Sequence, residues 1–238
     1  MPRGGGTPSP RRSLNMDITL TAGDGHAFTA YLCGPEDARA GIVVLPEIFG
    51  INAHIRQMAD RFAAQGYRAI CPSLFDRTPG GGTGLQLDYD PAGRDHGLAL
   101  RKGIRDEEAL LDIEACAAAL RGQAVRLVTG YCWGGYLSWR TACLSDSFAA
   151  ASCWYGGGIV RHCHDTPRMP VQMHFGGKDP SIPMADVEAI QAAQPDLPVH
   201  VYPEAGHAFG REGTAAHHPA SAALAWERTL AFFAGHAA

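Results

Sequence analysis

The residue best placed to do chemistry is Cys132, which stands in a Gly-x-Cys-x-Gly pattern with Gly130 and Gly134. An apolar, β-rich run ends just before this pattern, and a helical run begins just after it. A turn of this kind holds its nucleophile in a strained backbone conformation, so the residues two before and two after it must be small. The turn also puts the thiol at a helix N-terminus, where the dipole favours a thiolate. The pattern predicts a cysteine nucleophile, and its alternative is a buried core cysteine beside a glycine turn.

An acid and a base that would complete a triad follow Cys132 in the chain. Asp179 comes just after an apolar run at residues 171–175, and His207 lies in the loop after a second run at residues 199–202. This order of nucleophile, acid and base is that of α/β-hydrolase triads, in which the acid fixes the histidine tautomer and stabilises the imidazolium. Asp179 has the better position, directly after a strand. Three other carboxylates are alternatives, on a helix or close to the histidine: Asp186, Glu188 and Glu204.

The loop after the apolar run 41–45 holds a glutamate and a candidate oxyanion donor. In folds with this nucleophile turn, one donor comes from this loop and the other from the residue after the nucleophile. We therefore expect the backbone N–H groups of Ile48 and Trp133 to form an oxyanion hole. Glu47 points either at the site or at solvent, and its neighbours in the sequence leave both open.

An alternation of strands and helices would position these residues. Apolar, β-rich runs predict eight strands, at residues 17–21, 27–32, 41–45, 67–71, 125–129, 150–155, 171–175 and 199–202. Helical patterns predict five helices, at residues 54–65, 102–121, 133–145, 183–194 and 219–235. The alternation predicts an α/β-hydrolase fold, with a doubly wound, mostly parallel sheet and helices on both faces. In such sheets ligands bind beyond the carboxyl ends of the strands, where the candidate residues fall.

Three segments depart from the alternation. The two opening strands lack a helix between them, so we expect an antiparallel hairpin at one edge of the sheet. Residues 76–97 are rich in Gly, Pro and Asp without a period, which predicts a long functional loop. Residues 1–15 are rich in Gly, Pro, Ser and Arg, which predicts a disordered lead-in. We expect residues 16–238 to form a single α/β-hydrolase domain.

These motifs resemble those of the dienelactone hydrolase family. The similarity runs from Gly41 to the C-terminus. It is carried by Pro-Glu-Ile-Phe-Gly (46–50), Cys-Pro-Ser-Leu-Phe (71–75), Gly-Tyr-Cys-Trp-Gly-Gly (130–135), Trp-Tyr-Gly (154–156), Gly-Gly-Lys-Asp (176–179) and Gly-His-Ala-Phe (206–209). A Pro-Glu loop combined with a Gly-Tyr-Cys-x-Gly-Gly turn is quite specific to this family.

The resemblance implies that the Cys-His-Asp triad opens lactones or cleaves activated carboxylic esters through an acyl-enzyme, with no cofactor. It implies that Glu47 interacts with the resting thiol and helps to generate the thiolate when substrate arrives. Members that act on dienelactone bind the substrate carboxylate with two arginines, which the resemblance places at Arg94 and Arg211. Leu98 and Arg101 stand about where such members carry aromatic residues, so the resemblance does not fix the substrate.

The composition is that of a globular protein and disfavours other classes. The 238 residues carry a formal net charge of −4, which gives no signature of nucleic-acid or membrane-surface binding. Seven cysteines, an odd number without a Cys-x-x-Cys pair, indicate free thiols and a reducing compartment, and so the cytoplasm. The cluster His-Cys-His-Asp at residues 162–165 does not predict a metal site, because adjacent residues rarely bind one ion. We expect a monomer or weak homodimer.

Three alternative functions share part of this pattern. A general carboxylesterase for uncharged esters uses the same triad. Class I glutamine amidotransferases also carry Gly-x-Cys-x-Gly, but their histidine is followed two residues later by Glu, where this chain has Phe209. A non-catalytic binding protein on the same fold is the third, since fold does not determine function. Turnover of p-nitrophenyl acetate would exclude it.

Overall fold

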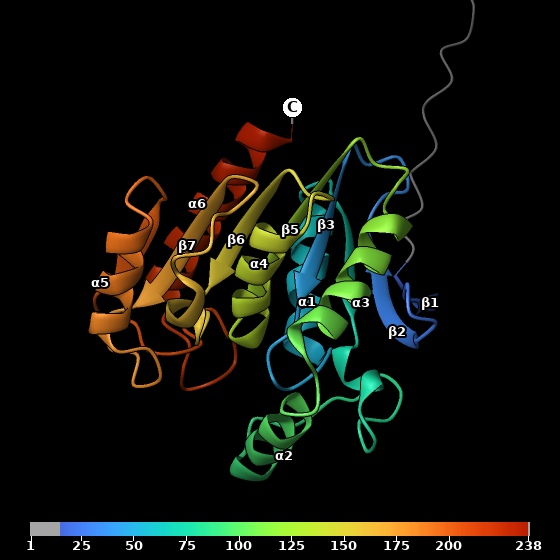
Figure 1. The fold of residues 1–238 in the computed structure, drawn as a ribbon, viewed down its shortest axis with the longest axis horizontal. Coiled ribbons are helices and arrows are strands. Elements are labelled where there is room, and N and C mark those ends of the chain that lie inside the picture. The colour runs from blue at the N-terminus through green and yellow to red at the C-terminus, as the bar shows by residue number, and fades with distance from the viewer. Residues whose placement is uncertain (1–14, 238) are drawn as a thin grey trace, which may run out of the picture.

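A computed structural model describes residues 15–237, and one eight-stranded sheet runs through it (Figure 1). The strands are β1 (Met16–Thr21), β2 (Ala27–Cys33), β3 (Ala40–Leu45), β4 (Arg68–Pro72), β5 (Val125–Tyr131), β6 (Ala150–Trp154), β7 (Val171–Gly176) and β8 (Val199–Tyr202). Their order is β1-β2-β4-β3-β5-β6-β7-β8. The pairs β1–β2 and β2–β4 are antiparallel and the others parallel, which confirms the predicted sheet and its edge hairpin. Apart from Asn15, the predicted lead-in lies outside the described residues.

Helices cover both faces of the sheet. They are α1 (Ala53–Ala64), α2 (Pro91–Arg101), α3 (Asp106–Ala119), α4 (Trp133–Leu144), α5 (Met184–Ala193) and α6 (Pro219–His236). On one face α1 packs on α6, where the Phe62 ring lies 4.5 Å from that of Trp226, and α3 and α4 lie on the other face (Figure 1). Every residue of β3, β6 and β7 is buried, which explains why the run in β3 is apolar without alternation.

The prediction of a loop over residues 76–97 was wrong at its C-terminal end, where α2 begins. Asp90 caps this helix by accepting a hydrogen bond from the N–H of Gly93 at 2.7 Å, and Pro91 occupies its first turn. A Cβ on Gly97 would lie 1.9 Å from the carbonyl oxygen of Ile48, so this glycine lets α2 approach the loop after β3. The helix thus lies beyond the carboxyl ends of the strands (Figure 1). The next helix, α3, begins at Asp106 and not at residue 102 as predicted.

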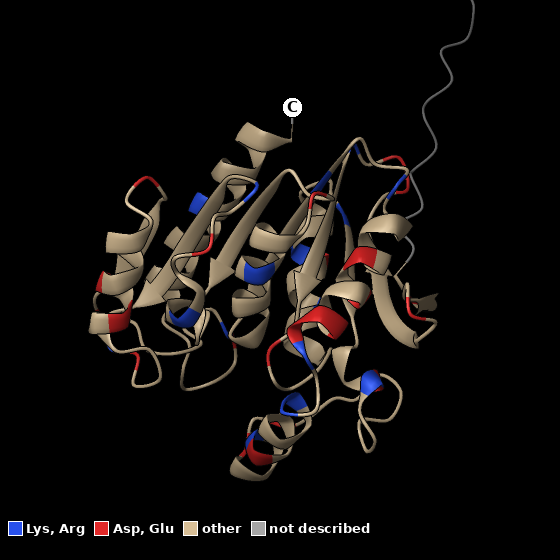
Figure 2. Ribbon diagram, in the orientation of Figure 1, with Lys and Arg blue, Asp and Glu red and all other residues tan. Residues whose placement is uncertain are grey.

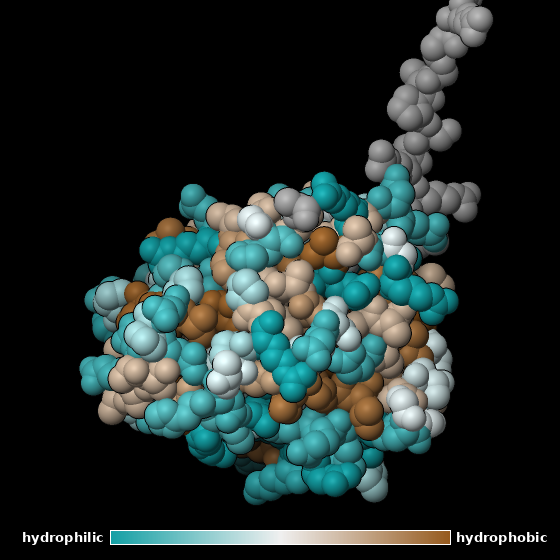
Figure 3. All heavy atoms as spheres, turned by 45° about the horizontal axis from the view of Figure 1, so that its top comes forward, coloured by the Kyte–Doolittle hydropathy of each residue, from teal (hydrophilic) through white to brown (hydrophobic). Residues whose placement is uncertain are grey.

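The surface of residues 15–237 is mixed in character. Acidic and basic residues are interspersed over the elements (Figure 2). On the face drawn in Figure 3, apolar residues form separate patches among hydrophilic ones. Within these described residues no helix combines the length and the apolar character that a bilayer crossing needs. The surface of these residues therefore shows no large patch of one charge or of apolar residues on the faces drawn.

Candidate active site

Cys132 occupies a strained turn between β5 and α4. Its φ of 55° and ψ of −110° lie in a region that residues with a side chain rarely adopt. A Cβ on Gly130 would lie 2.2 Å from the carbonyl oxygen of Gly134, and one on Gly134 would lie 2.2 Å from that of Leu45. The backbone N–H of Cys132 donates to the carbonyl of Trp154 at 3.0 Å. The small residues that the pattern requires are thus needed where the turn passes β3 and α4.

His207 and Asp179 form a hydrogen-bonded pair in the loops after β8 and β7. The distance from His207 Nδ1 to Asp179 Oδ2 is 2.7 Å. The Asp179 side chain is fully buried, and its Oδ1 accepts hydrogen bonds from the N–H groups of Ser181 at 2.8 Å and Ile182 at 3.2 Å. These bonds fix the carboxylate and leave Nε2 as the ring nitrogen available to a reacting group. Within residues 15–237, no hydrogen bond or ion pair joins any of the three alternative carboxylates to the histidine, and Glu204 instead pairs with Lys178.

The surroundings of His207 favour its charged form. Burial, the largest influence, lowers its pKa, but attraction to a thiolate at Cys132 and the hydrogen bond to Asp179 outweigh it and raise the pKa of His207 to about 10. The ring of Tyr155 packs edge-on against the imidazole, with 5.4 Å between centroids. The histidine is therefore suited to balance a thiolate and to deliver a proton.

Two backbone N–H groups lie beside the thiol without an acceptor. Ile48 and Trp133 line the same cavity as Cys132, and within the described part of the chain neither N–H donates a hydrogen bond. The backbone of Ile48 is held by its close contact with Gly97. Trp133 is held by its ring, which stacks on Phe75 with 5.5 Å between centroids. Preorganised donors without partners beside a nucleophile are what an oxyanion hole requires.

Glu47 is completely buried and pairs with Arg211, 164 residues further along the chain. Its Oε2 lies 2.9 Å from both Nε and Nη2 of the arginine. The Tyr89 ring packs on the guanidinium, with its centroid 4.1 Å from Cζ, and its hydroxyl lies 3.4 Å from Oε2. Oε1 has no hydrogen-bond partner among residues 15–237, and no hydrogen bond there joins Glu47 to Cys132. The contact with the resting thiol that the resemblance implies is thus replaced by a contact with Arg211.

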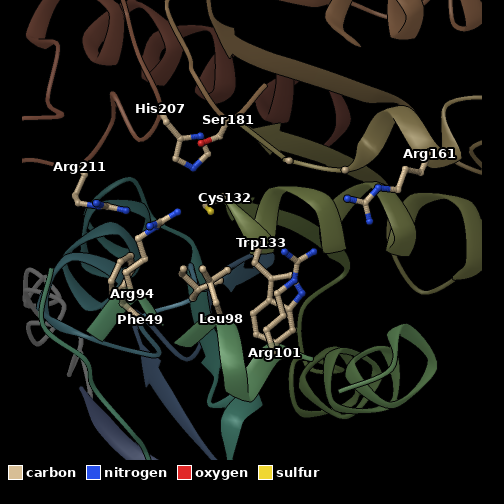
Figure 4. A pocket seen from close by; sticks show the side chains of 13 residues that line it. Phe49, Arg94, Leu98, Arg101, Cys132, Trp133, Arg161, Ser181, His207 and Arg211 are labelled. Atoms are coloured by element: carbon tan, nitrogen blue, oxygen red, sulfur yellow. The ribbon is translucent and has the colours of Figure 1, made fainter. Parts of the chain in front are cut away.

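A cavity of about 320 Å³ connects these groups (Figure 4). Cys132 and His207 face it, whereas Asp179 and Glu47 do not line it. Figure 4 shows Arg94 and Arg211 on one side of the thiol, with Arg94 reaching in from α2. The volume suits a small molecule. The structure therefore brings the predicted residues to one place and puts the predicted arginines at its edge. Among residues 15–237, no three His, Cys, Asp or Glu side chains gather as a metal site would require.

Comparison with known proteins agrees with this architecture. The sequence model of the dienelactone hydrolase family matches residues 28–237. The chain belongs to the dienelactone hydrolase family. It is 35% identical to a carboxymethylenebutenolidase of Pseudomonas putida over 233 residues, covering 93% of this chain and 97% of that protein. A crystal structure of a candidate dienelactone hydrolase from Klebsiella pneumoniae superposes with a TM-score of 0.78 at 33% identity, covering 92% of this chain and 99% of the other.

Membership of the dienelactone hydrolase family confirms the fold, the family and the enzyme class, a carboxylic ester hydrolase, predicted from the sequence. The sequence reasoning missed that the Tyr89 ring packs on the Arg211 guanidinium. It also missed that Arg94, Leu98 and Arg101, which the resemblance placed near the substrate, lie on a helix that lines the cavity. These three are spaced as neighbours on one helix face, and the Asp-Pro start of α2 was the signal that would have placed them.

Proposed function

We propose that this dienelactone hydrolase family member opens lactones or cleaves activated esters through an acyl-enzyme on Cys132, with His207 and Asp179 completing the triad. The observation that carries the proposal is one cavity shared by a strained thiol, the His207–Asp179 pair and two unused N–H donors. The relatives named as carboxymethylenebutenolidases support a small lactone or ester as the substrate.

The reaction follows from these positions. The Cys132 sulfur attacks the carbonyl carbon, and the carbonyl electron pair moves to the oxygen, which the N–H groups of Ile48 and Trp133 stabilise. When the tetrahedral intermediate collapses, the carbon–oxygen bond to the leaving group breaks and His207 donates its proton to the departing alkoxide. Water then attacks the thioester carbonyl while His207 accepts one of its protons. The second tetrahedral intermediate collapses, the carbon–sulfur bond breaks, and the acid product leaves with the Cys132 thiolate and the His207 imidazolium restored. No step requires a cofactor, because every electron pair and proton belongs to substrate, water or the triad.

The substrate, in this proposal, carries a carboxylate that Arg211 binds with help from Arg94. Glu47 occupies Nε and Nη2 of Arg211, whereas Nη1 makes no hydrogen bond to the described residues and is available to a ligand. Arg94 is exposed on α2 and has no ion-pair partner within residues 15–237. A substrate carboxylate would compete with Glu47 for the guanidinium. This competition gives Glu47 its proposed role, since a carboxylate released from Arg211 is free to help deprotonate the Cys132 thiol, whose proton passes to His207.

The test compares an acidic lactone with a neutral ester of similar size. We expect Arg211→Ala to lower the acidic-to-neutral ratio of kcat/KM by about ten- to hundredfold. This is the loss in rate that corresponds to one charge-assisted hydrogen bond in a partly dry pocket. Arg94→Gln should lower it by about three- to tenfold, because this side chain is exposed. Arg121→Gln is the matched control, since this exposed arginine lies in the turn between α3 and β5, at the opposite end of β5 from Cys132. An unchanged ratio in both cavity variants would contradict the carboxylate proposal and favour neutral esters.

We also propose a cytoplasmic enzyme, monomeric or weakly dimeric, without nucleic-acid or membrane partners. The support is that all seven cysteines are free thiols, as expected of a reducing compartment. Thiol titration of the purified, unfolded protein should count seven. Sedimentation over a range of concentrations should give the mass of one chain, or of two in weak exchange. A disulfide in protein purified with its thiols blocked at lysis would contradict the assignment to the cytoplasm.

A further inference from the structure

A second hollow, of about 370 Å³, adjoins the catalytic cavity. Arg101 and Arg161 line both spaces and so stand at the boundary between them. Figure 4 shows Arg161 on the side of Cys132 opposite Arg211, and Arg101 beside Trp133. The cavity therefore continues past the thiol, away from the arginines proposed to hold the substrate carboxylate.

Two different elements hold these side chains in place. Arg101 is the last residue of α2 and is half-buried, with its Cζ 5.9 Å from the Trp133 ring and 5.8 Å from the Tyr136 ring. Contacts of this length orient the guanidinium over the rings without consuming its N–H groups. Arg161 lies on the short helix η2 (Ile159–His162), where its N–H donates to the Gly158 carbonyl at 3.1 Å. Its side chain is exposed.

Neither arginine has an anionic partner in the described part of the chain. Among residues 15–237, no ion pair involves either arginine and no Asp or Glu lines the catalytic cavity. The one carboxylate that lines the second hollow is Asp106, and it already accepts hydrogen bonds from the Tyr136 hydroxyl and from Arg140. Lys102 adds a further cation to this hollow. Cations that converge on a cleft without counter-charges raise the local concentration of anionic ligands.

We infer that Arg101 and Arg161 form a second anion subsite, and that the substrate is an ester or lactone with two carboxylates, one to either side of the scissile carbonyl. Cys132 stands between the two arginine pairs, so a molecule held at both ends presents its centre to the thiol. Guanidinium groups suit this task because they pair with carboxylates through two parallel hydrogen bonds. The inference rests on the proposed function, since it takes the triad and the first carboxylate subsite as given.

The experiment uses three esters of the same alcohol and similar length, with no carboxylate, one carboxylate and two carboxylates. In the wild-type enzyme the second carboxylate should raise kcat/KM by about three- to tenfold over the mono-acid, a modest gain because both arginines are partly solvated. Arg101→Gln and Arg161→Gln should each bring this diacid-to-monoacid ratio towards one. Arg121→Gln removes the same charge in the turn that precedes β5, far from the thiol along the strand, and should keep the wild-type ratio. Melting temperatures confirm that each variant is folded.

The two proposals fail in different ways. A wild-type diacid-to-monoacid ratio near one, or a ratio that survives both substitutions, would overturn the second subsite while leaving the triad and the first subsite intact. A monoacid-to-neutral ratio near one in the wild type would instead overturn the first carboxylate subsite. Raising the ionic strength should reduce the diacid gain in the wild type, and a gain that is indifferent to salt would contradict a charge-based subsite.

Discussion

The ion pair between Glu47 and Arg211 predicts two substitutions whose effects are far from additive. The Glu47 side chain is fully buried and that of Arg211 is 11% exposed. Arg211→Met would leave a buried carboxylate whose nearest remaining partner is the Tyr89 hydroxyl, 3.4 Å away. Removal of one partner from a buried ion pair costs about 3–5 kcal/mol, because the other charge stays desolvated. We expect Arg211→Met to lower the free energy of unfolding by this amount.

A double-mutant cycle separates the pair from its surroundings. Glu47→Leu and the Arg211→Met/Glu47→Leu double variant complete it, and the double variant leaves no unpaired buried charge. Its loss of stability should be smaller than the sum of the two single losses by at least about 2 kcal/mol. The measurement is urea unfolding followed by tryptophan fluorescence, with the slopes compared to check that unfolding is two-state.

Two results would refute this reasoning. One is a loss below about 1 kcal/mol for Arg211→Met, which is the range of an exposed ion pair. The other is a double variant that loses the sum of the single losses. Either result would mean that water solvates Glu47, reaching it through the unpartnered Oε1. The proposed competition between the substrate carboxylate and Glu47 would then lose its basis.

Three further predictions test other parts of the site. Gly134→Ala should destabilise the protein and abolish activity, because the new Cβ would lie 2.2 Å from the Leu45 carbonyl oxygen. A well-folded, active variant would disprove this close approach. Glu47→Gln should slow the burst of p-nitrophenol from a p-nitrophenyl ester that carries a carboxylate, because an amide cannot accept the thiol proton. It should also lower the melting temperature, because Arg211 keeps a buried charge without its counter-charge. A wild-type burst rate in the folded variant would contradict the role of Glu47 in acylation. The pKa of His207 is raised from 6.5 to about 10, so its contribution to stability is fully present below about pH 6.5 and is lost as the pH rises through about 10. The urea midpoint should fall over this window in the wild type and less in His207→Gln, and identical profiles would contradict the shift.

Local constraints made the nucleophile turn predictable from the sequence. The glycines around Cys132 are needed where the backbone of the turn passes Leu45, and such close approaches leave a short pattern in the sequence. The buried central strand β3 was likewise recognisable from its apolar run without alternation. The positions of Asp179 and His207 followed from the rule that parallel sheets gather functional residues at the carboxyl ends of strands.

Tertiary contacts determined what the sequence could not reveal. Gly93 and Gly97 lower the helix propensity of α2, yet each allows a close backbone approach, to Asp88 and to Ile48 respectively. Glu47 and Arg211 are 164 residues apart, and nothing in a single sequence indicates that two such distant residues pair. For the same reason Arg161, an exposed arginine on a short helix, could not be assigned to the cavity before the fold was known.

The proposed mechanism requires Cys132 to carry the acyl group during turnover. The most direct measurement is mass spectrometry of enzyme acid-quenched within the first turnover of an activated ester, followed by peptide mapping. We expect a mass increase equal to the acyl group on the peptide that contains Cys132, and neither adduct nor turnover in Cys132→Ala. An acyl group on another residue, or turnover by Cys132→Ala close to that of the wild type, would contradict it.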